Sequence, residues 1–149
     1  MTRSHSARKI AGFTLIEMMC AVAVAGVLSS VAFPTFQNVV HKARRSDARV
    51  ALWHLQMSQE RYRSDHASYA SLAELGAVST SPSGQYSLSI ASSSDAGFRA
   101  QAMAVGLQAS DAPCRYMQLV SDGLNVSHLS GNDATLSNND AVNKQCWGI

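Results

Sequence analysis

A single carboxylate lies inside an apolar segment near the start of the sequence. Residues 13–36 read FTLIEMMCAVAVAGVLSSVAFPTF, and Glu17 is their only charged residue. A carboxylate in an apolar environment is costly, so its presence there is by default a sign of function. The chemistry open to it is electrostatic pairing with a cation, and we treat Glu17 as the first candidate site residue.

The three cysteines are a second source of chemistry. Cys20 lies in the apolar segment, whereas Cys114 and Cys146 bracket the C-terminal quarter, and no CxxC pair suggests a redox motif or a zinc ribbon. A Cys114–Cys146 disulfide would close a loop of about 33 residues, worth roughly 3–4 kcal/mol through chain entropy. Outside the cytoplasm such a pair is expected to be oxidised.

The remaining reactive side chains form no recognisable catalytic pattern. The sequence contains no HExxH, GxSxG, P-loop or GxGxxG motif. The C-terminal Asp and Asn residues suggest a calcium loop, but the spacing of an EF-hand is absent. We therefore expect no enzyme, no metal and no cofactor. The scattered residues considered were His5, His41, His54, His66, His128, Asn132, Asp133, Asn138, Asn139 and Asp140.

The elements that must position these residues follow from the distribution of charge. Residues 1–12 hold three basic residues and no acidic one, residues 37–64 carry a net charge of +4, and residues 65–149 carry −4. A basic leader, an apolar segment, a basic stem and an acidic C-terminal region indicate a membrane-oriented protein with a cytoplasmic leader. The overall charge of +2 gives no reason to expect a nucleic-acid binder that depends on bulk charge. The acidic C-terminal region disfavours DNA further.

The apolar segment has two interpretations. Met18 to Phe33 contains no charged residue, and with its flanks it reaches the roughly 20 residues of a helical bilayer crossing. The alternative is a secretory signal peptide with a small-x-small cleavage site at Ser30-Val31-Ala32. Glu17 and the helical pattern that continues beyond that site count against a signal peptide.

The same segment carries a family resemblance. Gly12-Phe13-Thr14-Leu15-Ile16-Glu17 resembles the processing motif of the type IV pilin superfamily. The resemblance implies that prepilin peptidase cuts between Gly12 and Phe13, that the new Phe13 amine is N-methylated, and that Glu17 is the fifth residue of the mature chain. Pro34 falls where many members have a helix-bending proline, although the stem lacks the second proline of the best-known members.

The resemblance also assigns roles in assembly. The Phe13 ammonium and the Glu17 carboxylate neutralise each other in lipid, and in a filament Glu17 could instead meet the N-terminus of a neighbouring subunit. Gly26 and Pro34 bracket poor helix formers, so we expect a bend or local melting there. Two rows of small or short side chains would allow close helix packing. These rows are Ala21, Ala25 and Ser29, and Val22, Gly26 and Ser30.

The predicted fold is α+β and pilin-like. A long N-terminal helix has a membrane-spanning first half, residues 13–36, and an amphipathic second half, residues 37–63, which packs on about four antiparallel strands. A continuous helix from Phe13 to Arg63 would measure about 76 Å, and only its second half can be covered by a small domain. The exposed half must lie in lipid or against other copies. The stripe predicted to face the sheet is Ala48, Ala51, Leu52, Leu55 and Tyr62.

The C-terminal region, residues 64–149, is predicted to be a β-rich globular domain with a disulfide-bounded loop, residues 114–146. A short helix is expected at Tyr69–Leu75. Alternating patterns and turn signals predict the strands, whereas residues 130–145 are too polar to form a core. The strand patterns lie at residues 86–91, 98–104, 115–120 and 124–129.

The predicted function is that of a type IV pilus structural subunit, either a major or a minor pilin, that serves adhesion, twitching motility or DNA uptake. The alternatives are a pseudopilin of a type II secretion system and a ligand- or DNA-recognition module displayed on a pilus. The expected partners are other pilins, prepilin peptidase, the inner-membrane assembly machinery and membrane lipid, with DNA disfavoured. The chain is expected in the bacterial inner membrane with its C-terminal region in the periplasm, and then in an extracellular pilus.

Overall fold

The computed structural model describes residues 13–149, which form two compact units, one ending at Gln37 and one comprising Asn38–Ile149. We call the second unit the head. Helix α1 (Leu15–Asp65) contributes to both units and extends two residues past its predicted end. Its backbone is helical at Gly26 and Pro34, so a bend at these positions stays a prediction.

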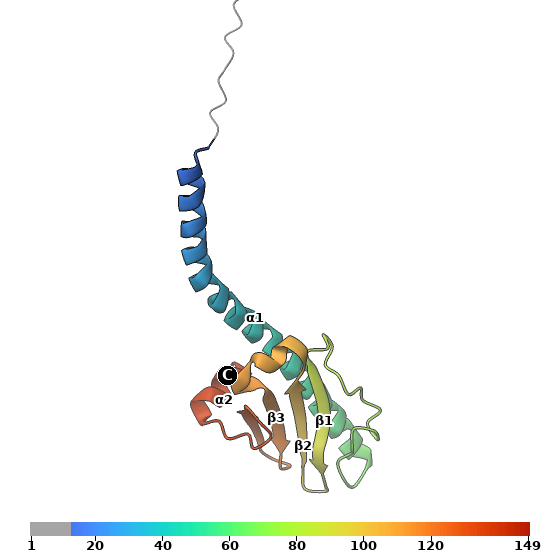
Figure 1. The fold of residues 1–149 in the computed structure, drawn as a ribbon. Coiled ribbons are helices and arrows are strands. Elements are labelled where there is room, and N and C mark those ends of the chain that lie inside the picture. Colours follow the sequence, from blue (N-terminus) through green and yellow to red (C-terminus); the bar gives the residue numbers. More distant parts are fainter. Residues whose placement is uncertain (1–12) are drawn as a thin grey trace, which may run out of the picture. The chain divides into compact units, whose positions relative to one another are not determined.

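The head contains the predicted antiparallel sheet (Figure 1). Its four strands lie in the order β1-β2-β3-β4, and each pairs with the next along the chain. Both hairpin loops lie at one end of the sheet, because Phe98 pairs with Ser93 and with Ser121, which in turn pairs with Val126. The strands are β1 (Tyr86–Ser93), β2 (Phe98–Ala104), β3 (Tyr116–Ser121) and β4 (Val126–Gly131).

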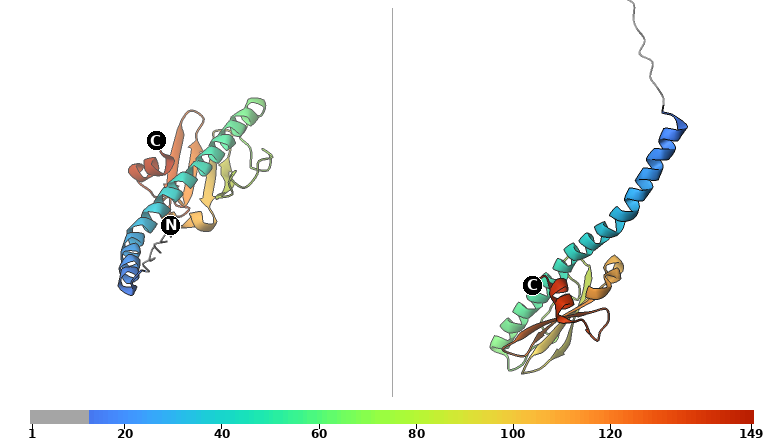
Figure 2. Two further views of the ribbon diagram at one scale, coloured as in Figure 1. Left: turned by 90° about the horizontal axis from the view of Figure 1, so that it is seen from above. Right: turned by 90° about the vertical axis from the view of Figure 1, so that its left-hand side faces the viewer.

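The head part of α1 covers one face of this sheet (Figure 2). Ala48, Ala51, Leu52 and Leu55 are buried against it, as their spacing predicts. Tyr62 does not join the core: it is half-buried and stacks on the ring of His66, with centroids 3.8 Å apart. The sheet contributes Tyr86, Leu88, Phe98, Ala100, Ala102, Met117 and Leu119 to the core.

The prediction of a short helix at Tyr69–Leu75 is wrong. This segment forms a hydrogen-bonded turn, Leu72–Gly76, in which the Ser71 N–H and hydroxyl both donate to the Glu74 carboxylate at 2.7 Å. Gly76 ends the turn with φ +60°, in the left-handed region that glycine adopts without strain. The capping pattern of Ser71 and Glu74 can start a helix, but Gly76 adopts its left-handed conformation before a helix can extend.

The prediction that residues 130–145 are too polar to form a core agrees with the structure, because none of them belongs to the buried hydrophobic cluster and only Val142 packs against it. The segment nevertheless contains structure that the sequence did not predict. Strand β4 reaches Gly131, and helix α2 (Asp140–Trp147) follows a loop. The Asn139 side chain accepts from the Val142 N–H at the start of α2, a typical N-cap. The Trp147 side chain is fully buried and donates its indole N–H to the Leu129 carbonyl at 3.0 Å.

Two unpredicted 3-10 turns connect β2 to β3 at the end of the sheet opposite the hairpin loops. They are η1 (Gly106–Ser110) and η2 (Ala112–Cys114). Both are fastened to the rest of the head by side chains, described below.

Candidate functional site

The first candidate site is the start of α1. The Glu17 Oε2 atom accepts from the Thr14 N–H at 2.7 Å and from the Thr14 hydroxyl at 2.8 Å. The Glu17 N–H donates in return to the Thr14 Oγ1 atom at 3.3 Å. This reciprocal arrangement is a capping box, which satisfies donors at a helix N-terminus that have no partner within the helix. Thr14 is therefore a site residue missed by the sequence analysis, although its signal, Thr-x-x-Glu, is legible in the sequence.

The capping box leaves the site open to a further partner. Phe13 directly precedes it and is 84% exposed. Both bonds from Thr14 go to the same oxygen of Glu17, and within the described residues the Oε1 atom accepts no hydrogen bond. The carboxylate can thus cap its own helix and still present an oxygen to a cation. Gly12, the other predicted cleavage residue, lies outside the described residues.

We expect the mature protein to begin at Phe13, with an N-methylated amine, and to retain 137 of the 149 residues. Cleavage there leaves the capping box intact. The intact mass of protein extracted from membranes measures the start directly. A chain that begins at Phe33, after the alternative site, would contradict the processing prediction.

The first unit presents apolar side chains to its surroundings. Leu15, Ile16, Val22 and Val27 are each at least 65% exposed, and both rows of small or short side chains are exposed as well. Surface of this kind needs a partner of similar polarity. Among the described residues, no helix has both the length and the apolar character required to cross a membrane.

A buried polar network fastens α1 to the turns between β2 and β3. The Arg45 guanidinium makes two bonds with the Asp111 carboxylate, at 2.7 and 2.8 Å, and this contact raises the pKa of Arg45. The fully buried Gln108 amide donates to Asp111 and to the Tyr86 hydroxyl, and its oxygen lies 3.1 Å from His41 Nδ1. Burial raises the pKa of Tyr86 to about 12, so the phenol stays protonated at physiological pH. The network fastens η1, through Gln108, and the junction of η1 and η2, through Asp111, to α1 and β1.

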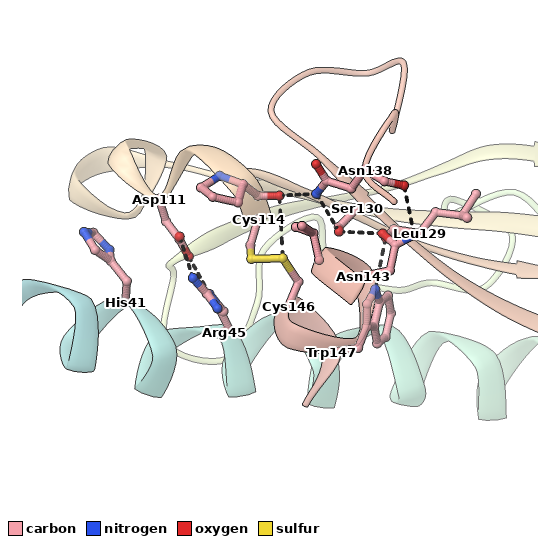
Figure 3. Close-up of a disulfide and its surroundings, with 12 residues drawn as sticks. His41, Arg45, Asp111, Cys114, Leu129, Ser130, Asn138, Asn143, Cys146 and Trp147 are labelled. Carbon is pink, nitrogen blue, oxygen red and sulfur yellow. Dashed lines mark hydrogen bonds and ion pairs between the residues drawn. A yellow bond between two sulfur atoms is a disulfide. The ribbon is translucent and has the colours of Figure 1, made fainter. Parts of the chain in front are cut away.

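The Cys114–Cys146 disulfide, expected from the sequence, is present and joins η2 to α2 (Figure 3). Both cysteines are buried. Polar bonds support the same junction: Asn138 Nδ2 donates to the Pro113 carbonyl at 2.6 Å, and the Ser130 hydroxyl donates to Asn143 Oδ1 at 2.7 Å. The disulfide therefore belongs to a cross-linked end of the head, in line with its predicted structural role.

The outer face of the sheet, turned away from α1, has an unusual composition. The four strands contain no Asp or Glu, and Arg99 is their only Lys or Arg. Arg99 is exposed on the outer face, and Gln101 lies directly opposite Gln118 on the neighbouring strand. Tyr116 and Met103 form the next cross-strand pair on this face. The acidic residues that give the C-terminal region its negative charge all lie outside the strands.

The histidines are dispersed among different structural contexts. His41 joins the network at η1, His66 stacks on Tyr62, and His128 packs against Trp147 with ring centroids 4.4 Å apart. Within residues 13–149 no group of three His, Cys, Asp or Glu side chains is placed to hold a metal ion.

Two family models match the sequence. The first, described as "Type IV minor pilin ComP, DNA uptake sequence receptor", matches residues 34–118, more than half of the chain. The second, a prokaryotic N-terminal methylation motif, matches residues 7–33. The two matches meet within α1, and together they span residues 7–118, which end within β3.

Curated relatives match over part of the chain. The type IV major pilin protein PilA of Myxococcus xanthus is 36% identical over 66 residues, which are 44% of this chain and 30% of that protein. The type IV major pilin protein PilE1 of Neisseria gonorrhoeae is 46% identical over 37 residues, 25% of this chain and 22% of that protein. Fimbrial protein EcpC of Eikenella corrodens is 43% identical over 37 residues. The chain spans less than a third of the length of these relatives.

Proposed function

We propose that this chain is a pilus subunit whose head binds DNA. The premise is that the chain belongs to the family of the type IV minor pilin ComP, DNA uptake sequence receptor. The observation that carries the proposal is the family match over residues 34–118, which includes the head part of α1 and the strands β1 and β2 complete. In this proposal the first unit, which contains the N-terminal part of α1, serves assembly. The second unit, the head, serves DNA binding.

Assembly is supported by the first unit. Its exposed apolar side chains and its match to the N-terminal methylation motif are typical of a helix that is covered by other helices in a filament. We propose that prepilin peptidase processes the chain before Phe13, and that the protein occupies the inner membrane before it enters a surface filament. The open oxygen of Glu17 then supplies the contact to the Phe13 amine of a neighbouring subunit.

DNA binding is supported by the outer face of the sheet. Guanidinium and amide groups are the side chains that read base edges: Arg binds guanine and Gln binds adenine through paired hydrogen bonds. Arg99 is exposed and Gln101 is half-buried on β2 of this face, whereas Gln118, opposite Gln101 on β3, is buried, and the four strands contain no acidic residue. The net charge of −4 is an average over the C-terminal region. It therefore does not disfavour DNA binding on this particular surface.

The proposal predicts that the isolated head, residues 38–149, binds duplex DNA and that Arg99→Ala weakens binding roughly 5- to 150-fold, for a contact worth about 1–3 kcal/mol. If Arg99 contacts a phosphate, the dependence of binding on salt concentration also becomes less steep, by about one unit of the log–log slope. Fluorescence anisotropy of a labelled duplex, titrated at several salt concentrations, measures both quantities.

The matched control is Arg61→Ala, which removes another exposed arginine, from α1, without touching the outer face. It should leave binding within about twofold of the wild type. A head that binds no duplex at low salt, or that responds equally to both substitutions, would contradict recognition through this face.

A further inference from the structure

The head contains an apolar groove that the proposed function does not use. It lies between α1 and the segment before β1, and its volume is about 480 Å³. Ala51 and Leu55 line it from α1, and Ala77, Val78 and Leu88 line it from the other side, with no Asp, Glu, Lys or Arg in the lining. Val78 is 72% exposed at its edge. We call it the α1 groove.

Two further large apolar side chains of α1 are exposed outside the lining of the groove. Trp53 and Met57 follow one another at helical spacing on α1, next to the groove residues His54 and Ser58, and are 44% and 63% exposed. A groove lined largely by apolar side chains, with Val78 exposed at its edge, favours a protein partner that inserts an aliphatic side chain.

The head also presents such a side chain at another place. Leu107 in η1 is 79% exposed, although η1 is fastened to α1 and β1 through the hydrogen bonds of Gln108 with His41 and Tyr86. The next residue, Gln108, is fully buried in the Arg45–Asp111 network. A large apolar side chain held out on a rigid turn loses little conformational freedom when it binds. Leu124, in the β3–β4 hairpin loop, is 96% exposed but lacks such an anchor among the described residues.

The charges beside the two features are complementary. The Arg115 guanidinium lies against η1, donating to the Ala109 carbonyl at 2.7 Å, and makes no ion pair within the described residues. The Asp47 carboxylate borders the α1 groove, where it accepts from the groove residue Ser81 and from the Ser83 N–H. Asp47 likewise has no ion-pair partner in the part of the chain that the structure describes. A cation beside the leucine and a carboxylate beside the groove would fix the orientation of a contact between them.

We propose that Leu107 of a second copy of this chain inserts into the α1 groove, and that this contact places copies next to one another in the filament. The inference rests on the proposed function, since it requires the chain to enter a filament. Leu107 lies at the level of His41 and the groove at residues 51–58, about 20 Å further along α1. Because the leucine and the groove are different patches, the contact is heterologous and continues from copy to copy as an open series.

A consequence concerns DNA binding. Copies joined in this way enter the filament in contiguous runs, so several outer sheet faces lie side by side. Adjacent weak sites on one filament bind a long duplex more tightly than isolated ones, because the second contact is intramolecular.

The test is cysteine cross-linking in the full chain, expressed in cells that assemble pili. Leu107→Cys and Val78→Cys are combined in a Cys20→Ser background, sheared filaments are oxidised mildly, and products are separated without reductant. We expect dimers and longer multiples at ten times the background or more. The matched control pairs Leu124→Cys with Val78→Cys and should give background only. Separately, Leu107→Asp should lower the filament-to-membrane ratio of the protein at least tenfold, whereas Leu124→Asp should leave it unchanged.

The outcomes separate the two proposals. Filaments that contain the protein but show no Leu107–Val78 cross-link above the Leu124 control overturn this inference and leave the pilus subunit in place. Cross-links from Val78 to a different protein overturn the commitment to a second copy. A wild-type chain that never appears in sheared filaments overturns both proposals.

Discussion

Cys114→Ser should lower the free energy of unfolding of the isolated head by about 2–5 kcal/mol, the usual cost of removing a native disulfide from a small domain. The disulfide joins residues 32 apart in the sequence and connects η2 to α2, whose hydrophobic contribution is chiefly the buried Trp147. At about 4 °C per kcal/mol, the melting temperature should fall by roughly 8–20 °C. Thermal and denaturant unfolding of wild type and variant, under oxidising conditions, measure the difference.

Two comparisons assign the effect to the disulfide. Wild type under reducing conditions should unfold like Cys114→Ser, and Cys20 cannot contribute because the isolated head lacks it. Asn138→Ala removes the bond to the Pro113 carbonyl at the same junction and should cost only about 1 kcal/mol. Unchanged melting with and without reductant would mean that the polar bonds around Ser130 and Asn138 hold the junction by themselves.

The elements that could be predicted from the sequence are those whose signal is local and repeated. The strands β1 and β2 alternate apolar and polar residues through Tyr86, Leu88, Phe98 and Ala100, and their core face follows directly from that alternation. The buried stripe of α1 follows from its helical spacing in the same way. A pattern repeated over several turns or residue pairs outweighs the preference of any one residue.

Helix α2 could not be predicted by the same means. It has only eight residues, half of them polar, and its stability depends on contacts with distant parts of the chain: the disulfide to Cys114 and the Trp147 bond to Leu129. The Arg45–Asp111 pair is another case, since the two residues are 66 positions apart and no spacing rule connects them. Tertiary contacts of this kind determine whether a short element forms, even where its local sequence does not favour it.

The start of α1 differs from both cases, because its signal is present in the sequence and has two meanings. Thr14-x-x-Glu17 is a capping box, and it also falls within the motif that resembles the pilin processing site. Glu17 therefore has two explanations. It can contact a neighbouring subunit during assembly, and it can cap its own helix, which needs no partner. Substitutions at Thr14 and Glu17 can separate the two.

Glu17→Ala should reduce incorporation of the protein into filaments roughly 10- to 100-fold while leaving cleavage and membrane insertion unaffected. The substitution removes a charge contact with the Phe13 amine of a neighbour in an apolar setting. Coulomb energy is large there but desolvation offsets much of it, so we expect a net loss of a few kcal/mol. Each 1.4 kcal/mol is about a factor of ten in the equilibrium. The measurement is the ratio of the protein in sheared surface filaments to that in the inner membrane.

The capping box supplies the controls that make this experiment decisive. Glu17→Gln keeps an oxygen able to accept from Thr14 but has no charge, whereas Thr14→Ala removes the capping partner, at about 1 kcal/mol, and keeps the carboxylate. If the charge directs assembly, Glu17→Ala and Glu17→Gln both fall 10- to 100-fold and Thr14→Ala falls less than tenfold. If Glu17 acts only as a helix cap, the filament-to-membrane ratio of Glu17→Gln equals that of the wild type, and the ratio of Thr14→Ala equals that of Glu17→Ala. Equal ratios for wild type and Glu17→Ala would show that this carboxylate does not direct assembly, because nothing else in the apolar segment could replace its charge.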